Sequence, residues 1–109
     1  MQGGNNIVEL NVFELKEKLD SKDITLIDVR EDYEIEICYI KNSKHIIMNQ
    51  IPNSLDLLDK KDRYAIICHS GVRSLAVSQY LVSKGYNVKN VTGGIDEWAL
   101  KIEKSMKRY

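Results

Sequence analysis

Residues 64–74, with the sequence YAIICHSGVRS, decide the fold of this chain. The first four residues form an apolar run that is typical of a buried strand. The next six, Cys68 to Arg73, contain a glycine and predict a turn. A helix with an apolar face follows over residues 74–84, and Gly85 ends it as the residue after its cap. The stretch therefore predicts a strand that passes through a short loop directly into a helix.

The same alternation of strands and helices continues in both directions along the chain. Alternating elements of this kind predict a mainly parallel sheet with helices on both faces. Ligands in such sheets bind beyond the carboxyl ends of the strands, which is where Cys68 lies. We therefore expect one α/β domain over residues 1–109, with its core at about 7–100. The other strands are predicted at residues 7–10, 24–29, 45–48 and 87–91, and the other helices at 12–20, 31–37 (or a turn), 50–58 and 95 to about 107.

Local signals support two of these boundaries. Asn11 and Glu14 have the spacing of a capping box in front of the first helix. Gly93 and Gly94 interrupt the pattern after the last strand and predict a break before the final helix.

The composition is that of a globular protein and argues against several classes of function. Of 109 residues, 43% are hydrophobic and 29% are charged, which does not fit a disordered chain. Sixteen basic and sixteen acidic residues cancel, so bulk electrostatics gives no reason to expect a nucleic-acid or membrane partner. Apolar runs long enough to span a membrane are lacking, and residues 1–6 do not have the pattern of a secretory signal.

The two cysteines and two histidines add to this picture. Two cysteines cannot form a disulfide scaffold, so we expect a reducing, cytoplasmic location. The histidines and cysteines are too scattered along the chain for the paired spacing of a zinc site, so no metal is expected.

Cys68 lies where the predicted strand turns into the helix, and this position suits a reactive thiol. The first N–H groups of a helix are unpaired, and with the positive end of the helix dipole they favour an anion. Gly71 allows the loop to curl so that successive N–H groups converge on that anion. We therefore predict that Cys68 is a nucleophile with a lowered pKa, rather than a small buried residue at a strand end.

Several motifs of the chain resemble the rhodanese family of sulfurtransferases. The most specific are the loop CHSGVRS at residues 68–74 and the Gly-Gly-x-x-x-Trp element at 93–98. The sequence LIDVRE at 26–31 and the Gly-Tyr pair at 85–86 match as well. The resemblance extends from about residue 7 to residue 100, and single-domain members of the family have this length and this order of elements.

The resemblance implies a reaction and a set of site residues. Cys68 takes a sulfane sulfur from a donor such as thiosulfate, carries it as a persulfide, and passes it to a thiol, to cyanide or to a protein acceptor. Backbone N–H groups of the loop hold the transferred sulfur. No cofactor is implied, because the thiolate itself carries the sulfur. The implied substrate-binding residues are His69, Ser70, Gly71, Val72 and Arg73.

Two other functions remain open. One is a sulfur-carrier or protein-binding rhodanese module with little turnover of small molecules. The other is phosphatase or arsenate-reductase chemistry, which uses a Cys-x5-Arg loop on a related fold. Here four residues separate Cys68 from Arg73, so the ring of N–H groups is tighter and suits one sulfur atom rather than a tetrahedral oxyanion. We therefore prefer the sulfurtransferase.

Residues at the edge of the loop are expected to support it. The resemblance places Asp28 and Arg30 near the loop, where they brace it, or else form only an ion pair at the surface. Arg73 either attracts an anionic donor, which we slightly prefer, or pins the loop to a carboxylate such as Asp28 or Glu31. Cys38 is expected to be a bystander rather than a thiol that resolves the persulfide.

The chain departs from the family pattern at residues 38–46. Family members usually carry a Gly-His-Ile-Pro-Gly-Ala type motif there, whereas this chain has the sequence CYIKNSKHI. Only Ile40 and the apolar strand after it correspond clearly. We expect this difference to change the local backbone shape more than the chemistry at Cys68.

Overall fold

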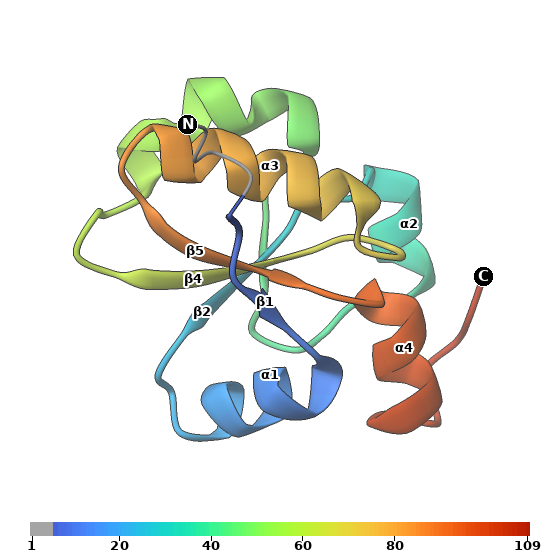
Figure 1. Cartoon of the computed structure of the whole chain (residues 1–109). Helices are drawn as coiled ribbons and strands as arrows, with labels where there is room; N and C mark the ends of the chain where they lie inside the picture. The colour runs from blue at the N-terminus through green and yellow to red at the C-terminus, as the bar shows by residue number, and fades with distance from the viewer. Residues whose placement is uncertain (1–5) are drawn as a thin grey trace.

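A computed structural model describes residues 6–109, and at its centre lies a sheet of five strands that are all parallel (Figure 1). The order of strands across the sheet is β1-β5-β4-β2-β3. Helices flank the sheet, so the predicted α/β fold is confirmed. The strands are β1 (Glu9–Leu10), β2 (Thr25–Asp28), β3 (Lys44–His45), β4 (Arg63–Ile67) and β5 (Asn87–Val91).

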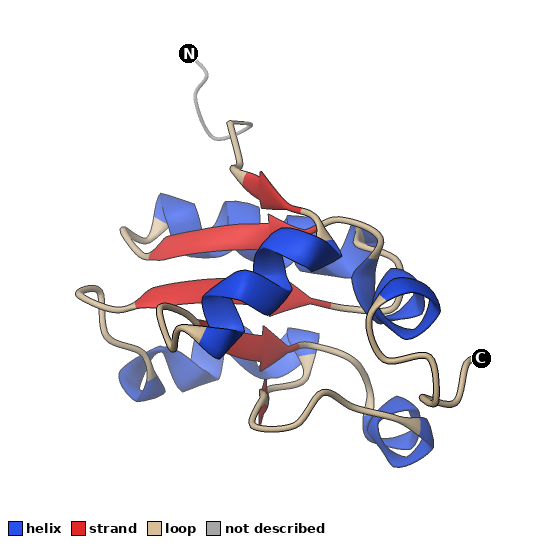
Figure 2. Ribbon diagram, turned by 90° about the horizontal axis from the view of Figure 1, so that it is seen from below, coloured by secondary structure: helices blue, strands red, loops and turns tan. Residues whose placement is uncertain are grey.

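Helices cover both faces of the sheet (Figure 2). The two-residue period of β4 divides the core between the faces. Ala65 and Ile67 pack with side chains of α1 and α4, whereas Ile66 and Cys68 pack with side chains of η2 and α3. The helices are α1 (Val12–Asp20), α2 (Asp32–Ile37), the 3₁₀ helix η2 (Met48–Leu57), α3 (Val72–Ser83) and α4 (Gly94–Lys101).

The predicted caps of two helices are confirmed. The Asn11 side chain accepts a hydrogen bond from the Glu14 N–H at 2.8 Å, and the Glu14 carboxylate accepts one from the Asn11 N–H at 2.9 Å. At the end of α3, Gly85 has a φ of +94°, which a residue with a side chain rarely adopts. The Tyr86 N–H then donates to the Leu81 carbonyl at 3.0 Å and closes the helix end.

The helix α3 begins at Val72, two residues before the predicted start. Gly71 has a φ of +108° and turns the chain so sharply that the helical ladder starts at once. The Leu75 N–H already donates to the Gly71 carbonyl at 3.2 Å. Arg73 therefore belongs to the first turn of the helix and not to the loop.

The strand predicted at residues 45–48 is wrong in its extent, because β3 ends at His45 and η2 starts at Met48. The Met48 N–H donates to the Val29 carbonyl at 3.0 Å, so the chain still follows the end of β2 for a few residues. The helix predicted at residues 50–58 corresponds to η2, which is a 3₁₀ helix. Pro52 lies inside it. Proline has no N–H and cannot complete an α-helical ladder, whereas short 3₁₀ turns tolerate it.

The unusual stretch at 38–46 makes its turn without glycine or proline. Asn42 adopts a φ of +69°, a conformation that asparagine tolerates better than most residues. The Ser43 N–H and hydroxyl both donate to the Ile40 carbonyl, at 3.1 and 2.7 Å. A local turn therefore leads the chain into β3.

The final helix is shorter than predicted, because α4 ends at Lys101 and not near residue 107. Ile102 and Met106 pack against the core on the α1 and α4 side. The Trp98 indole donates to the Glu103 carboxylate at 3.2 Å. These tertiary contacts outweigh helix propensity, and segment 102–109 turns back toward α2 (Figure 1).

Within residues 6–109, none of the helices combines the length and the apolar composition that a membrane-spanning helix requires. The expectation about a secretory signal concerns residues 1–6, of which residues 1–5 lie outside the described part.

Candidate functional site

The Cys68 sulfur lies between the carboxyl end of β4 and the first turn of α3, and the residue is only 1% exposed. The N–H groups of Gly71 and Ser74 donate to the sulfur at 3.1 and 3.3 Å. The Ser74 hydroxyl lies 3.3 Å from it. Gly71, the N-cap residue of α3, has no side chain that could cap the helix, so the Cys68 sulfur takes the place of a capping oxygen.

These donors control the charge of the Cys68 thiol. Burial by itself raises the pKa of the thiol, because it disfavours the charged form. Hydrogen bonds from the Ser74 hydroxyl and from the N–H groups of Ser74, Gly71 and Ser70 outweigh burial and lower the pKa below its ordinary value. The site can therefore hold a sulfur anion, which is the property that a nucleophilic thiol needs.

The start of α4 holds the loop from the other side. The Ile95 N–H donates to the Cys68 carbonyl at 2.9 Å, and the Asp96 N–H donates to the His69 carbonyl at 3.1 Å. Gly94 has a φ of +58°, and a Cβ added there would collide with both carbonyl oxygens. The Gly-Gly-x-x-x-Trp element therefore anchors the loop by a close approach that only glycine permits.

Arg73 forms a clasp with Glu34 of α2, which joins the starts of two helices. Its two terminal nitrogens donate to the two carboxylate oxygens at 2.7 and 2.9 Å. The expectation that Asp28 or Glu31 would be the partner is wrong, because the partner is Glu34, the buried residue in the first turn of α2. The Arg73–Glu34 clasp favours the bracing role of Arg73 over our preference for donor attraction. The clasp raises the pKa of Arg73, so the arginine stays charged.

Asp28 and Arg30 form a buried ion pair and not a surface pair. Both side chains are at most 1% exposed, and Arg30 Nη2 lies 2.7 Å from the Asp28 carboxylate. Burial by itself lowers the pKa of Arg30, but hydrogen bonds with Asp28 and Tyr109 outweigh it and raise that pKa. Arg30 also donates to the Cys38 carbonyl at 2.8 Å. The pair therefore fixes the chain on both sides of α2, the helix that carries Glu34.

The remaining predicted site residues differ in exposure. Val72 is 75% exposed and Ser70 is exposed, so both side chains face solvent beside the loop. The His69 ring is half-buried and stacks on the Tyr109 ring. Cys38 is half-buried with a free thiol, and its sulfur lies 3.9 Å from Arg30 Nη1. Within residues 6–109, no cluster of side chains suitable for a metal ion is found.

Sequence analysis did not assign roles to four residues that shape this site. Ser74 follows the loop and could have been found as a donor at the helix start. Glu34 and Asn90 make contacts across the fold, and the buried Asn90 amide donates to the Gly71 carbonyl at 3.2 Å. Tyr109 lies 75 residues from Glu34, whose carboxylate it contacts. No local pattern predicts contacts at such separations.

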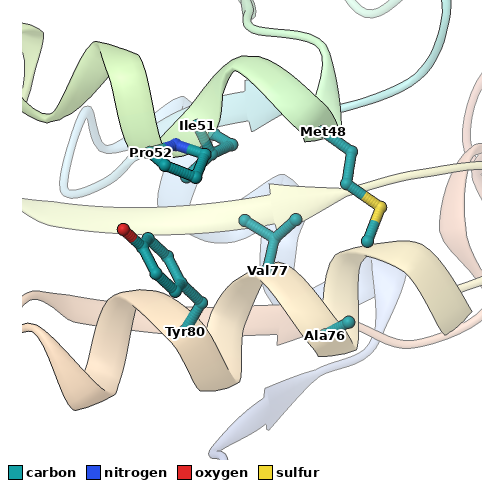
Figure 3. A pocket seen from close by; sticks show the side chains of 6 residues that line it. All are labelled: Met48, Ile51, Pro52, Ala76, Val77 and Tyr80. Carbon is teal, nitrogen blue, oxygen red and sulfur yellow. The ribbon is translucent and has the colours of Figure 1, made fainter.

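A pocket of about 210 Å³ lies apart from these residues, between η2 and α3 (Figure 3). Its lining is apolar and contains no predicted site residue. The lining residues are Met48, Ile51, Pro52, Ala76, Val77 and Tyr80.

The Arg73–Glu34 clasp predicts a specific loss of stability in acid. Hydrogen bonds from Arg73 lower the pKa of Glu34 from an ordinary 4.5 to about 2, against the opposing effect of burial. Because the folded pKa is the lower one, the stabilisation is complete above the unfolded pKa and is lost as pH falls toward 2. Glu34→Gln should remove this dependence, which we put at about 2 kcal/mol after allowing for the partly exposed Arg73. Denaturant unfolding between about pH 6 and pH 2.5 measures it.

Glu36→Gln is the matched control, because Glu36 is an exposed carboxylate on the same helix. The control variant should follow the native pH dependence. Equal pH dependence in the native protein and in Glu34→Gln would show that the clasp does not stabilise the fold.

Comparisons with known proteins agree with the fold and extend along most of the chain. The model of the rhodanese-like domain family matches residues 12–101. A Bacillus subtilis (strain 168) protein named "Putative sulfurtransferase YtwF" is 42% identical over 93 residues, which cover 84% of this chain and 90% of that protein. A rhodanese-like domain protein from Staphylococcus aureus has a solved structure with 41% identity and a TM-score of 0.81, covering 84% of this chain and 91% of that one.

A second Bacillus subtilis (strain 168) protein is named "Putative sulfur carrier protein YrkF". It is 32% identical over 104 residues, which cover 94% of this chain but 56% of that protein. The chain thus spans about half of this relative and nearly the whole of the first one.

Proposed function

The chain belongs to the rhodanese-like domain family, and from this membership we propose that it is a sulfurtransferase that works through a persulfide on Cys68. The observation that carries the proposal is the set of N–H donors on the Cys68 sulfur at the start of α3. Donors placed in this way stabilise a sulfur anion before and after it receives a second sulfur. The sulfurtransferase name of a relative at 42% identity supports the same chemistry.

The reaction consists of two displacements at sulfur. The Cys68 thiolate attacks the outer sulfur of a donor such as thiosulfate, so that a new S–S bond forms. The S–S bond of the donor breaks, and sulfite leaves with the electron pair. A thiolate or cyanide then attacks the outer sulfur of the persulfide, and Cys68 leaves as the thiolate with which the cycle began.

Mass spectrometry of the thiosulfate-treated protein tests this proposal. One added sulfur, about 32 Da, should appear and should disappear after cyanide treatment, as a covalent thiol intermediate requires. Peptide mapping should place the added sulfur on Cys68. A protein that takes up no sulfur from thiosulfate or from other sulfane donors, or that takes it up only on Cys38, would refute the proposal.

A sulfur-carrier module is the second candidate function, and the relative named as a sulfur carrier favours it. Both candidates form the persulfide, so mass spectrometry alone does not separate them. Turnover does: an enzyme releases thiocyanate repeatedly from thiosulfate and cyanide, whereas a carrier is loaded once and unloads only to its protein partner. We prefer the enzyme because the relative at higher identity carries the sulfurtransferase name.

The length of the loop predicts which anions the site accepts. Four residues separate Cys68 from Arg73, one fewer than in a Cys-x5-Arg phosphatase loop, so we expect too little room for the three equatorial oxygens of a phosphoryl group. The native protein should therefore show no phosphatase activity on an aryl phosphate. Insertion of one glycine between Ser70 and Gly71 should lower sulfur transfer by about tenfold or more, since the donors move away from the sulfur. Paired assays of both activities on both proteins check this, and robust phosphatase turnover by the native protein would contradict it.

A further inference from the structure

Tyr109 lies where three parts of the site meet. Its hydroxyl accepts a hydrogen bond from Arg30 Nη1 at 2.8 Å and donates one to the Glu34 carboxylate at 2.8 Å. Its ring stacks on the His69 ring, with centroids 4.1 Å apart and an interplanar angle of 11°. One side chain therefore contacts the end of β2, the helix α2 and the loop that follows Cys68.

The hydroxyl provides a side-chain link between two ion pairs. Arg30 is fully buried and needs an acceptor for each of its donors. Other acceptors of its Nη1 are distant, with the Glu34 carbonyl at 3.4 Å and the Cys38 sulfur at 3.9 Å. The Tyr109 hydroxyl is the close acceptor, and through it the Asp28–Arg30 pair is joined to the Arg73–Glu34 clasp.

Tyr109 must keep its hydroxyl proton to make this connection, and its pKa shows that it does. Burial and the neighbouring Glu34 raise the pKa of Tyr109 to about 12, although the hydrogen bond from Arg30 acts in the opposite direction. The hydroxyl therefore keeps its proton at neutral pH and can donate it to the carboxylate. Networks in which every donor and acceptor is matched hold their members in one geometry.

The Tyr109 ring contacts His69, the residue next to the proposed nucleophile. His69 follows Cys68 directly, and its carbonyl is already held by α4. Within the described residues, the buried Nε2 of His69 has no hydrogen-bond partner. Stacking on Tyr109 therefore helps to orient this ring.

Segment 102–109 brings Tyr109 to this place and is itself anchored. Ile102 and Met106 pack against the core, and Arg108 Nε lies 3.0 Å from the Asp96 carboxylate. The segment that carries Tyr109 is thus tied to α4, the helix whose N–H groups hold the loop carbonyls.

We propose that Tyr109 is a positioning residue for sulfur transfer, which fixes the loop through the Arg73–Glu34 clasp and the His69 ring. The proposal rests on the proposed function of Cys68. Tyr109 hydrogen-bonds to Arg30 and Glu34 and not to the sulfur; its role is to keep the N–H groups of Gly71 and Ser74 in place around the sulfur. Its loss should therefore weaken the stabilisation of the sulfur anion and lower kcat, while the KM for the donor changes little.

Two variants separate the hydroxyl from the ring, and a third controls for stability. Tyr109→Phe removes both hydrogen bonds and keeps the stacking, whereas Tyr109→Leu removes both features. Tyr86→Phe removes a comparable hydroxyl contact, a hydrogen bond to the Leu55 carbonyl at 3.3 Å, on the side of η2 and α3. The readout is a pH titration of the ultraviolet absorbance of the Cys68 thiolate, taken as the difference from Cys68→Ser.

The titration midpoint should rise by about 0.5 pH unit in Tyr109→Phe and by about one unit in Tyr109→Leu, because fewer fixed donors stabilise the anion. Turnover with thiosulfate should fall about threefold and tenfold, with the donor KM within about twofold of the native value. Tyr86→Phe should keep the native midpoint.

An unchanged midpoint in Tyr109→Leu, or equal shifts in all three variants, would overturn the proposal. A change in donor KM alone would overturn it as well, because Tyr109 would then contact the donor directly. The titration does not depend on turnover. If the native protein takes up no sulfur, the proposed function fails, while the midpoints still decide whether Tyr109 positions the loop.

Discussion

Cys68→Ser should lower sulfur transfer by roughly 10³-fold or more, because a serine hydroxyl cannot carry a sulfane sulfur. The fold should persist, since serine is close to cysteine in size and the N–H groups of Gly71 and Ser74 can donate to its oxygen instead. We expect no added sulfur in the mass spectrum and no thiocyanate production. A thermal melt within a few degrees of the native value shows that the loss is chemical.

Cys38→Ser is the matched control for this prediction. Cys38 is half-buried, and the structure describes no backbone N–H donors converging on its sulfur comparable to those on Cys68. The control variant should keep most of the sulfur uptake and turnover. Retention of the adduct in Cys68→Ser together with its loss in Cys38→Ser would reverse the assignment of the nucleophile.

Gly94→Ala should destabilise the fold by about 3 kcal/mol or more, which is a large effect for one added methyl group. The new Cβ would lie 2.5 Å from the Cys68 carbonyl oxygen and closer still to the His69 carbonyl oxygen. These are backbone atoms, so relief requires the loop to move away from α4. The positive φ of +58° adds strain for any residue with a side chain.

Gly85→Ala provides the matched control, because Gly85 also has a positive φ but an added Cβ would meet only a flexible side chain. Its added Cβ would lie 3.6 Å from the flexible Lys60 side chain. We expect a loss of about 1 kcal/mol from strain alone. Denaturant unfolding of both variants measures the difference. Similar losses in the two variants would show that the approach of α4 to the loop is not a tight constraint.

The sequence was sufficient to predict the sheet and the position of Cys68. β2 and β4 consist mainly of runs of apolar and β-branched residues. Such runs are typical of strands that are buried on both faces of a parallel sheet. Gly85, Gly93 and Gly94 mark helix and strand ends because their backbone angles exclude most other residues. Local chemistry of this kind can be recognised without knowing the rest of the fold.

The bracing of the site could not be predicted in the same way. The sequence argument offered Asp28 and Glu31 as partners of Arg73, and only the packing of α2 selects Glu34. The end of α4 was misplaced because Ile102 and Met106 fit a helical pattern as well as they fit the core. Tyr109 reaches Arg30 from 79 positions away, and that contact follows from the path of segment 102–109.

The depth of Cys68 has a consequence for the chemical durability of the protein. A cysteine that is 1% exposed meets peroxide and other oxidants rarely, so its thiolate is shielded from the irreversible steps that lead to sulfinic and sulfonic acids. Once a sulfur is added, the transferable atom lies one S–S bond, about 2 Å, beyond the cysteine sulfur. In the persulfide that we propose, this outer atom should meet oxidants before the cysteine sulfur does, and its oxidation should leave the cysteine beneath it intact.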